Sequence, residues 1–552
     1  KRKNNVIVDL IPEVWPGNYL YAVVNTVTYD NIATFKIKTP DGLEYTFGKA
    51  ESGFSYNRDD TPTDNTAWVL TKIEDPKNEN FVEFEYEDKH YLQANLSISF
   101  FKDKTTSKTS GLNNLIWGPT TSIVSNNSIK TNAYGGLSWQ IKKIKSTNYE
   151  IDFEMVESNQ LNYDYDAIGI RIINEREDSN ASTISSGLDN GIAPVPTFGL
   201  NPRPLNNRTR DQLNTITVRS RITNEIIKGF YFDYTNDENK RLYLKMVKEN
   251  GKNPYEFEYY NEGQLPDYLE EKWLIDHWGY YNNKQSPITD LNFDYRNNDI
   301  KYHNSREPDQ TYSKYGSLKK VTYPTRGYTI YDYENNRYTK MVNRSVTSGT
   351  SFPLLSHNEK IAGGLRIKTI KNYSNSNELS NLKEFSYEEG ILPFLPIYLI
   401  PDNSYASFSG TRKTGSIFSS STIVPLQDYG NIPVQYSKVT ELIKDTQNNS
   451  NGKVEYQYTN YDSYSDVPFS STFSPNLSNV FPSTINDKAR GNLLSKKVFN
   501  KSNSIVEEEI NVYSKNARVF SKVYAIKNNY YWSQSQGRFS QGAFYTITLN
   551  PY

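Results

Sequence analysis

Side chains able to perform acid–base or metal chemistry are scarce in this chain. Its 552 residues include four histidines, His90, His277, His303 and His357, and no cysteine. No His-Glu-x-x-His pair occurs, and the run that begins at His357 lacks the second ligand that a helical zinc site requires. The lack of cysteine also excludes disulfides, thiolate nucleophiles and cysteine-ligated zinc or iron–sulfur sites. We therefore expect no metal site and no cofactor.

The motifs of common enzymes are missing as well. The sequence has neither the Gly-x-Ser-x-Gly turn of a serine hydrolase nor the glycine-rich loop with Lys-Ser/Thr that cradles phosphates. A Ser-His-Asp triad assembled in space stays open, because triads are recognised by geometry. His277 beside Asp276 has the residue types of an acid–base pair, but neighbours on a strand point to opposite faces, which favours a structural histidine capped by aspartate. We expect no catalytic residue and a chain that is not an enzyme.

Two groupings of acidic residues suggest other chemistry. The pairs Glu270-Glu271 and Asp59-Asp60 would suit glycoside hydrolysis if two carboxyl groups lay about 5 to 9 Å apart across a cleft. A solvated face or turn is the favoured interpretation, because about a quarter of an ordinary protein's residues are charged. The stretch from Asn162 to Gly169 alternates oxygen ligands as a calcium loop does, but it lacks the loop's glycine and final glutamate, so a strand is favoured.

The densest aromatic cluster consists of Trp273, Trp278, Tyr280 and Tyr281. Exposed, these rings could stack on sugars or anchor a protein partner, so they are our candidate binding residues. Buried, they would bridge two sheets with their N–H and O–H groups bonded to loop carbonyls. Burial is favoured for the rings as a group, because large aromatic side chains dominate core energetics.

The elements that must position these residues are predicted to be β-strands. Short alternating runs separated by turns recur along the chain, which is the pattern of β-hairpins. In the first, Phe35–Lys38 and Leu43–Gly48 flank a turn in which Pro40 presets the backbone and Gly42 permits positive φ. Five further pairs follow the same pattern: Trp68–Asp75 with Phe81–Tyr86, Leu318–Tyr323 with Tyr328–Tyr333, Leu365–Ile370 with Lys383–Tyr387, Val439–Ile443 with Val454–Tyr458, and Leu493–Phe499 with Ile505–Tyr513.

The hairpins are spaced irregularly, so they form a degenerate repeat and not a strict solenoid. The best candidate for a helix is Pro266–Ile275, one to three turns long. Breaks are expected at the proline-rich stretch Gly187–Asn207 and at Ser345–Ser356. We divide the chain into four all-β blocks, residues 1–100, 101–207, 208–345 (with the aromatic cluster) and 346–552.

Composition narrows the classes of function. The formal net charge is -1, which argues against a nucleic-acid-binding groove. No apolar run approaches the roughly 20 residues needed for a transmembrane helix. The mean hydropathy of -0.74 could indicate disorder, but the 45 tyrosines and 7 tryptophans supply the half-apolar rings that disordered chains lack. We expect large antiparallel sheets that are wet on one face.

The chain begins with Lys1, which we interpret as a mature or trimmed start whose targeting segment is missing.

Four stretches resemble one known family. Trp68–Asp75 is similar to its Trp-x-Leu-x-Lys-Ile element, and Asp276–Asn282 resembles its most specific signature, Asp-His-Trp-Gly-Tyr-Tyr-Asn. Gly316–Tyr328 and then Gly363–Ile370 resemble two elements that follow in the same order. The family is the RHS/YD-repeat-like group of large secreted or surface proteins of Gram-negative bacteria, and the resemblance covers roughly residues 30 to 515.

The resemblance implies an all-β chain of degenerate YD-like hairpins in large curved antiparallel sheets, which in better-known relatives coil into a cocoon-like shell. The standard Tyr-Asp-x-x-Gly-Arg repeat is met only loosely, at Tyr331–Arg337, and no self-cleavage motif is found toward Tyr552. The resemblance also implies an extracellular or cell-surface location associated with the outer membrane, where export machinery is a candidate partner.

We therefore expect a non-enzymatic scaffold that encloses or presents a polypeptide, either a protein partner or its own downstream segment. Two alternatives stay open: a carbohydrate-binding or adhesive module that uses the aromatic cluster, and a hydrolase with an unrecognised site.

Overall fold

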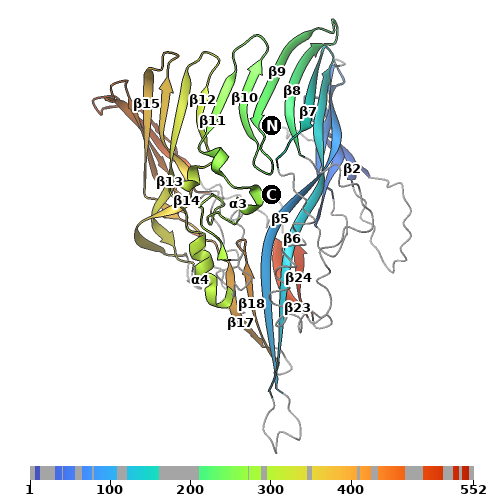
Figure 1. Ribbon diagram of the computed structural model, residues 1–552, viewed down its shortest axis with the longest axis vertical. Helices are drawn as coiled ribbons and strands as arrows, with labels where there is room; N and C mark the ends of the chain where they lie inside the picture. Colours follow the sequence, from blue (N-terminus) through green and yellow to red (C-terminus); the bar gives the residue numbers. More distant parts are fainter. Residues whose placement is uncertain are drawn as a thin grey trace, which may run out of the picture. The chain divides into compact units, whose positions relative to one another are not determined.

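The protein is described by a computed structural model that covers residues 7–12, 32–39, 41–55, 65–77, 80–108, 121–160, 210–271, 273–287, 295–344, 351–406, 411–423, 433–466, 486, 489–513, 526–533 and 538–545. It divides into two units, Lys1–Glu508 and Glu509–Tyr552. The first carries most of the strands (Figure 1). The second contains the hairpin of β23 (Ile526–Ser533) and β24 (Arg538–Tyr545).

The elements of the first unit are almost all strands. In chain order the strands are β1 (Ile7–Pro12), β2 (Ile32–Lys38), β3 (Glu44–Ser55), β4 (Asn65–Asp75), β5 (Asn80–Lys108), β6 (Thr121–Ser146), β7 (Tyr149–Glu157), β8 (Asp211–Ser220), β9 (Ile226–Thr235), β10 (Tyr243–Glu249), β11 (Tyr255–Tyr259), β12 (Leu318–Thr322), β13 (Tyr328–Val342), β14 (Leu354–Tyr373), β15 (Leu379–Glu388), β16 (Ile391–Leu392), β17 (Leu399–Ala406), β18 (Thr411–Ser419), β19 (Lys438–Lys444), β20 (Ser450–Tyr458), β21 (Leu493–Phe499) and β22 (Ile505–Ile510). The helices are α3 (Tyr268–Glu271) and α4 (Tyr295–Ser305), with single 3-10 turns at Glu262–Gln264 and Tyr312–Lys314.

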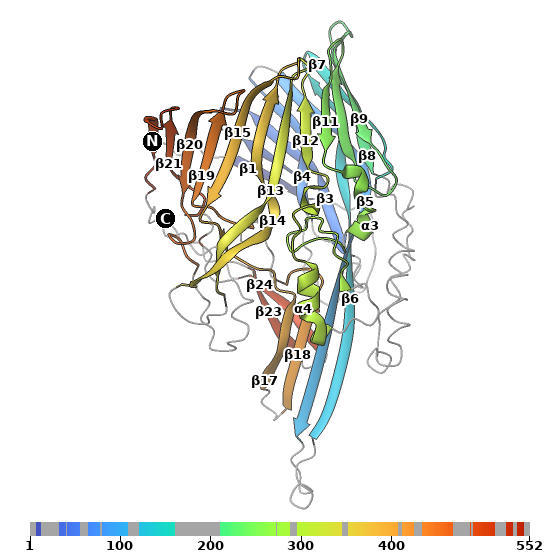
Figure 2. The same ribbon diagram turned by 60° about the vertical axis from the view of Figure 1, so that its left-hand side comes forward.

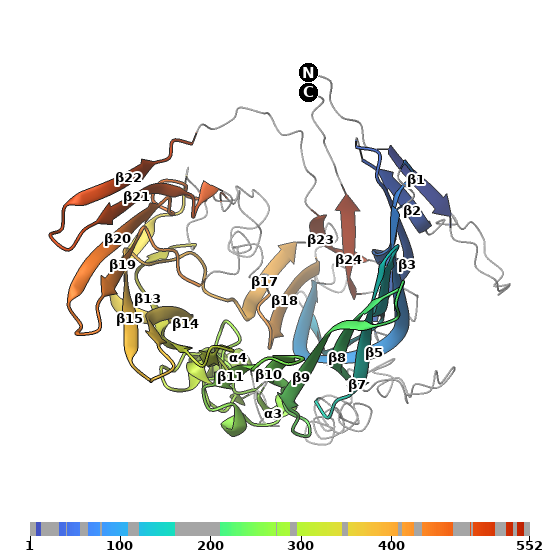
Figure 3. The same cartoon turned by 90° about the horizontal axis from the view of Figure 1, so that it is seen from above.

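The strands of the first unit form one large antiparallel sheet (Figure 2). Each strand from β1 to β15 pairs with the next one along the chain, and β15 then pairs with β19, β19 with β20 and β20 with β21. The short β13–β16 pair is parallel. Seen from above, strands β7 to β15 succeed one another along a curved surface (Figure 3). The expected all-β class with a large curved antiparallel sheet is confirmed.

The hairpins expected from the sequence are present. At the first turn, the Gly42 amide donates to the Thr39 carbonyl at 2.9 Å, and Gly42 has φ +99. Strand β2 pairs with β3, β4 with β5, β12 with β13, β14 with β15, and β19 with β20. The sixth pair of runs also forms strands, β21 and β22, joined by a turn in which the Asn500 amide donates to the Ser504 carbonyl at 3.0 Å.

The polar composition is explained by strands that are half-covered along their length. Every residue of β8 and β19 is partly exposed. Lysine and glutamate pair diagonally across neighbouring strands, as in Lys444–Glu384 and Lys383–Glu441, whose charged atoms are each 2.7 Å apart. Opposite charges in such positions contribute up to about 1 kcal/mol each. Because the two signs pair with each other, many charged residues can lie on the strands while the net charge of the sheet stays small.

Aromatic rings supply much of the apolar contact between strands. Tyr328 and Tyr373 lie opposite each other on β13 and β14 with ring centroids 4.7 Å apart, and Phe35 and Phe47 do the same on β2 and β3. Stacked pairs of this kind add about 0.5–1.5 kcal/mol beyond the area they bury. The abundance of tyrosine thus compensates for the shortage of aliphatic residues.

Two long excursions leave the sheet between strands that are themselves paired. The first insertion, residues 260–317, connects β11 to β12 and carries α3 and α4. The second insertion, residues 389–437, connects β15 to β19 and carries β16, β17 and β18. Its hairpin β17–β18 pairs with the distal half of β5, from Ser99 to Ser107. The second insertion therefore links two parts of the sheet that are far apart in the sequence.

Several sequence-based expectations can be placed within these elements. The expected helix at Pro266–Ile275 is present as the single turn α3. None of the helices in the ranges described above has the length and apolarity to cross a membrane. The stretch Asn162–Gly169, the pair Asp59-Asp60 and the break Gly187–Asn207 lie outside the described residues. The four-block division stays a prediction.

Candidate functional site

The run Asp276–Asn282 forms a tight loop in the first insertion. The Asp276 carboxylate Oδ1 accepts hydrogen bonds from the amides of Trp278 at 2.9 Å and Tyr280 at 3.0 Å. The backbone of Asp276 also donates to the Tyr280 carbonyl at 2.7 Å, and Gly279 takes φ +94. A short acidic side chain followed by glycine produces this geometry, because the carboxylate bonds its own backbone two residues on and glycine tolerates positive φ.

Asn282 ties the loop to the end of α4. Its side-chain amide donates to the carbonyls of Ser305 at 2.9 Å and Glu307 at 3.0 Å, and its own oxygen accepts from the Lys284 amide at 3.1 Å. Asn282 is 1% exposed. All the hydrogen bonds of this buried amide serve to position backbone, so Asn282 has a structural role.

The loop packs against the start of the run Gly363–Ile370. A Cβ atom added to Gly363 of β14 would collide with the Trp278 ring and lie 2.6 Å from Asp276 Oδ2. Its neighbour Gly364 has φ +80 and lies close to Asn336 and Tyr280. The Asp-His-Trp-Gly-Tyr-Tyr-Asn run and the Gly-Gly-Leu-Arg-Ile run therefore contact each other, and the paired glycines are required by the close approach.

The two insertions meet in a buried aromatic cluster. Tyr302 of α4 donates its hydroxyl to the Ser420 carbonyl at 2.5 Å, and its ring lies 5.1 Å from both Tyr398 and Phe418. Tyr302 and Phe418 are 1% and 0% exposed. Edge-to-face contacts of these large rings join the insertions over a well-packed surface.

His277 lies at the edge of this aromatic cluster and is 4% exposed. Its Nδ1 is 3.0 Å from the Tyr398 hydroxyl, and its ring centroid is 4.2 Å from that of His303. Its Nε2 is 3.7 Å from Glu307 Oε1, which is beyond hydrogen-bonding distance. Burial lowers the pKa of His277 to about 4, so the imidazole is neutral at pH 7.

Asp276 and His277 do not form an acid–base pair. Asp276 bonds the loop backbone through Oδ1, its Oδ2 has no hydrogen-bond partner, and burial raises its pKa to about 6. His277 instead contacts Tyr398. The expectation of a histidine capped by Asp276 is wrong, because Asp276 bonds the turn amides through Oδ1 and the His277 ring contacts the Tyr398 hydroxyl instead.

The four candidate binding residues differ in their accessibility. Tyr281 is 8% exposed and lies against the rings of Tyr312 and Tyr315. Trp278 packs on the core cluster that contains Tyr338. Tyr280 is 37% exposed and Trp273 is half-buried. Two of the four rings are therefore committed to packing within the fold, and the binding role of the group stays a prediction.

The acidic residues considered for glycoside hydrolysis are partly placed. Glu271 of α3 is buried and accepts a hydrogen bond from Arg241 at 2.8 Å. This ion pair fixes the end of α3 to the loop between β9 and β10. The partner of the buried Glu271 carboxylate is therefore an arginine, whereas glycoside hydrolysis requires a second carboxyl group.

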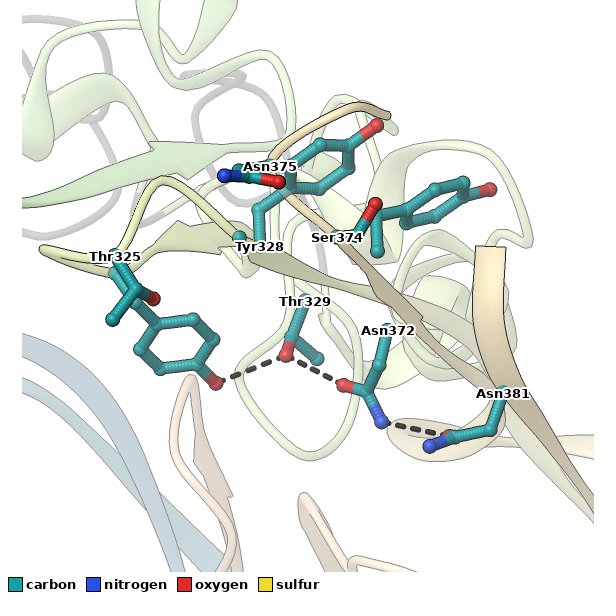
Figure 4. Close-up of a pocket in the computed structure, with 10 residues that line it drawn as sticks. Thr325, Tyr328, Thr329, Asn372, Ser374, Asn375 and Asn381 are labelled. Atoms are coloured by element: carbon teal, nitrogen blue, oxygen red, sulfur yellow. Dashed lines mark hydrogen bonds between the residues drawn. The ribbon is translucent and has the colours of Figure 1, made fainter. Parts of the chain in front are cut away.

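A polar hollow that the sequence did not indicate lies at the turns of β12–β13 and β14–β15 (Figure 4). Its volume is about 530 Å³, and it is open to solvent. A chain of hydrogen bonds crosses it: the Tyr323 hydroxyl is 2.9 Å from Thr329 Oγ1, which donates to Asn372 at 2.7 Å, and Asn372 donates to Asn381 at 2.8 Å (Figure 4). The paired runs Leu318–Tyr333 and Leu365–Tyr387 contain these residues, but only strand pairing brings them together.

A buried group of ion pairs joins the segment after β13 to the segment after β20. Asp466 is 0% exposed and pairs with Arg344 Nη2 at 2.7 Å and Arg490 Nη1 at 2.8 Å. The Phe352 ring lies 5.1 Å from the Arg344 guanidinium. Buried charges persist only when paired and hydrogen-bonded in this manner.

Comparison with known proteins gives no family assignment. No family model matches the chain, and no curated protein matches it. Solved structures with a weak likeness include a TcdB2-TccC3 complex (TM-score 0.22, 9% identity) and the Tc holotoxin pore of Photorhabdus luminescens (TM-score 0.20, 9% identity). The aligned regions cover 89% and 88% of this chain but only 24% and 23% of the solved chains, so the chain spans about a quarter of their length.

Proposed function

We propose that this chain is a non-enzymatic β-scaffold of the RHS/YD-repeat-like type that holds a polypeptide. The observation that carries the proposal is the continuous antiparallel sheet, from β1 through β15 to β21, held by two insertions that pack on each other. Such a sheet offers a wide surface of half-exposed strands and tyrosines. Extended peptides bind the exposed edges of sheets through backbone hydrogen bonds, and half-exposed tyrosine rings give a protein ligand an amphipathic contact surface.

The placement of the titratable groups supports a scaffold over a hydrolase. Asp276 bonds a turn, Glu271 pairs with Arg241, and Asp466 pairs with two arginines. The hollow in Figure 4 is lined by tyrosine, threonine, serine and asparagine, not by carboxylates and imidazoles. A general acid or base must lie within reach of a bound substrate. In the part of the chain described, these groups instead hold backbone or each other.

The proposed setting is the outside of the cell or its outer surface, where the polypeptide held would be a protein partner or a further segment of the same precursor. The near balance of 62 basic and 63 acidic residues, a formal net charge of -1, fits a protein ligand better than a nucleic acid.

Binding of an unfolded polypeptide tests the proposal. The full chain would be mixed with a fluorescently labelled casein, which has little stable structure, and fluorescence anisotropy and protection from protease would be measured. Saturable binding with protection is the expected result. A hydrolytic activity in a broad substrate screen, or the absence of any polypeptide binding by the folded chain, would overturn it.

The hollow in Figure 4 favours a glycan ligand as the second candidate function. Stacked Tyr328 and Tyr373 beside a row of Asn and Thr side chains combine a flat apolar surface with directional polar groups, which is what a sugar ring requires. Binding on a glycan array that is lost in Tyr373→Ala would support this candidate. Tyr149→Ala, which removes a tyrosine that is 53% exposed outside the hollow, is the matched control. A silent array would remove the candidate.

A further inference from the structure

Three side chains with metal-binding atoms converge where the Asp276–Asn282 loop meets the end of α4. They are His277, His303 and Glu307, and their nearest ligand atoms all lie within 4.8 Å of one another. His303 belongs to α4, and Glu307 follows it by four residues, at the point where the helix has ended. The fold thus brings together two of the four histidines of the chain.

The distances suit a single ion. Glu307 Oε1 lies 3.7 Å from His277 Nε2 and 3.7 Å from His303 Nδ1. Two ligand atoms that each lie about 2.1 Å from a zinc ion are about 3.4 Å apart when the coordination is tetrahedral. The carboxylate is therefore already close to both imidazoles, yet too far from either for a hydrogen bond. A small rotation of the half-exposed His303 would bring the third separation into range.

His277 is oriented as a metal ligand would be. Its Nε2 is buried and has no hydrogen-bond partner, and it faces Glu307. Its Nδ1 is 3.0 Å from the Tyr398 hydroxyl. If Nδ1 carries the hydrogen and donates it to Tyr398, the lone pair of Nε2 points toward the carboxylate. Ligating histidines generally have their second nitrogen held in this way.

The surrounding charges permit a cation. Glu307 supplies a carboxylate oxygen that lies 3.7 Å from a nitrogen of each imidazole. Asp276 is the residue before His277, and its carboxylate is close enough to interact with the buried Arg306. Lys284 lies nearby but its ammonium bonds the Glu307 carbonyl. The Glu307 side chain is 49% exposed, so water can complete the coordination from the solvent side.

We propose that His277 Nε2, His303 Nδ1 and Glu307 Oε1 form a binding site for one divalent transition-metal ion of the zinc class. Two imidazoles and one carboxylate are the ligand set that zinc and similar ions prefer, and the three atoms leave at least one position for water. The ion would join the Asp276–Asn282 loop to the end of α4. The site does not depend on which polypeptide the scaffold holds.

The test uses the full chain without an affinity tag, treated with EDTA and dialysed. Zinc binding is measured by calorimetry, and Co²⁺ is used as a spectroscopic probe because its visible absorption reports tetrahedral nitrogen and oxygen ligands. We expect one ion per chain, an absorption band with Co²⁺, and a higher Tm with zinc, because an ion that binds only the folded state stabilises it.

Two variants with accessible side chains assign the ligands. His303→Asn and Glu307→Gln should each weaken zinc binding by about tenfold or more and abolish the zinc-dependent rise in Tm. His357→Asn removes a histidine of β14 outside the cluster and should bind as the parent chain does. Circular dichroism of the metal-free variants checks that they fold. Zinc binding that is absent in the parent chain, or unchanged in both ligand variants, would overturn the proposal.

Discussion

Gly363 is the residue at which the addition of one methyl group most directly probes the packing of β14 on the Asp276–Asn282 loop. A Cβ there would meet the Trp278 ring and the Asp276 carboxylate. Both neighbours are held by the turn and by the core cluster around Tyr338, so neither can withdraw freely. We expect Gly363→Ala to lower the free energy of unfolding by about 1–3 kcal/mol, measured by urea denaturation.

The control for this substitution is Gly263→Ala. A Cβ at Gly263 would meet nothing within 4 Å, so the same chemical change adds no contact. Equal stabilities of the two variants would show that the close approach between Gly363 and Trp278 is not present in solution.

Tyr302 offers a second test, of the contact between the two insertions. Its hydroxyl donates to the buried Ser420 carbonyl at 2.5 Å. Tyr302→Phe keeps the ring contacts but leaves that carbonyl without this donor, and we expect a loss of about 1–3 kcal/mol in the free energy of unfolding. Tyr315→Phe, which removes a bond to the exposed end of Gln264, should cost less than about 1 kcal/mol. Similar losses in both variants would contradict a buried bond at Tyr302.

Among the elements, the segments after β13, after β20 and before β21 are joined by the Arg344–Asp466–Arg490 group. Asp466 is the shared anion of two cations that are themselves largely buried. In Asp466→Asn both arginines lose the negative charge that these two ion pairs share, in a largely buried position. We expect a loss of about 3–5 kcal/mol, measured by chemical denaturation.

The control lies in the same loop. Asp462 pairs with Lys340 at 3.3 Å, and both side chains are well exposed. Asp462→Asn should change the free energy of unfolding by less than about 1 kcal/mol, because exposed ion pairs contribute little. A comparable effect of the two substitutions would mean that Asp466 is accessible to water.

At this scale the sequence predicted the strands well and the helices poorly. Hairpins such as β12–β13 follow from local alternation and turn residues, which act over a few positions. Helix α4, Tyr295–Ser305, was missed because its residues are mostly polar and its sequence has no apolar stripe; among its described side chains, Tyr302 is the large ring that is buried. The helix is held by contacts of Tyr302 with the second insertion. These residues are more than 90 positions away in the sequence, so no local pattern around the helix indicates the contact.

For the whole molecule, the behaviour at high pH follows from tyrosine rings that folding covers, fully at Tyr461 and partly at Tyr243, Tyr260 and Tyr387. Burial raises the pKa of Tyr243, Tyr260, Tyr387 and Tyr461 from 10.0 to about 12. A phenol whose pKa is raised by folding contributes stability that is fully present below its unfolded pKa and lost as the pH rises through the folded value. We expect the free energy of unfolding to be steady up to about pH 10 and to fall between about pH 10 and pH 12.

Tyrosinate absorbance during an alkaline titration checks this expectation. One class of tyrosines should ionise near its ordinary pKa, and a second class should ionise only near pH 12 or after unfolding in urea. A single class that ionises near pH 10 in the folded chain would contradict the burial of these rings.

The sequence by itself determined that the chain is all-β, where its hairpins turn, and which runs resemble a known family, because these properties depend on residues that are close neighbours along the chain. Tertiary structure decided which side chains meet: His277 with Tyr398 and Glu307, and Asp466 with its two arginines. It also decided that the Asp276 carboxylate bonds a turn and not His277. Strand pairing and the two insertions bring these groups together over long separations in the sequence, and alternation carries no information about contacts at that range.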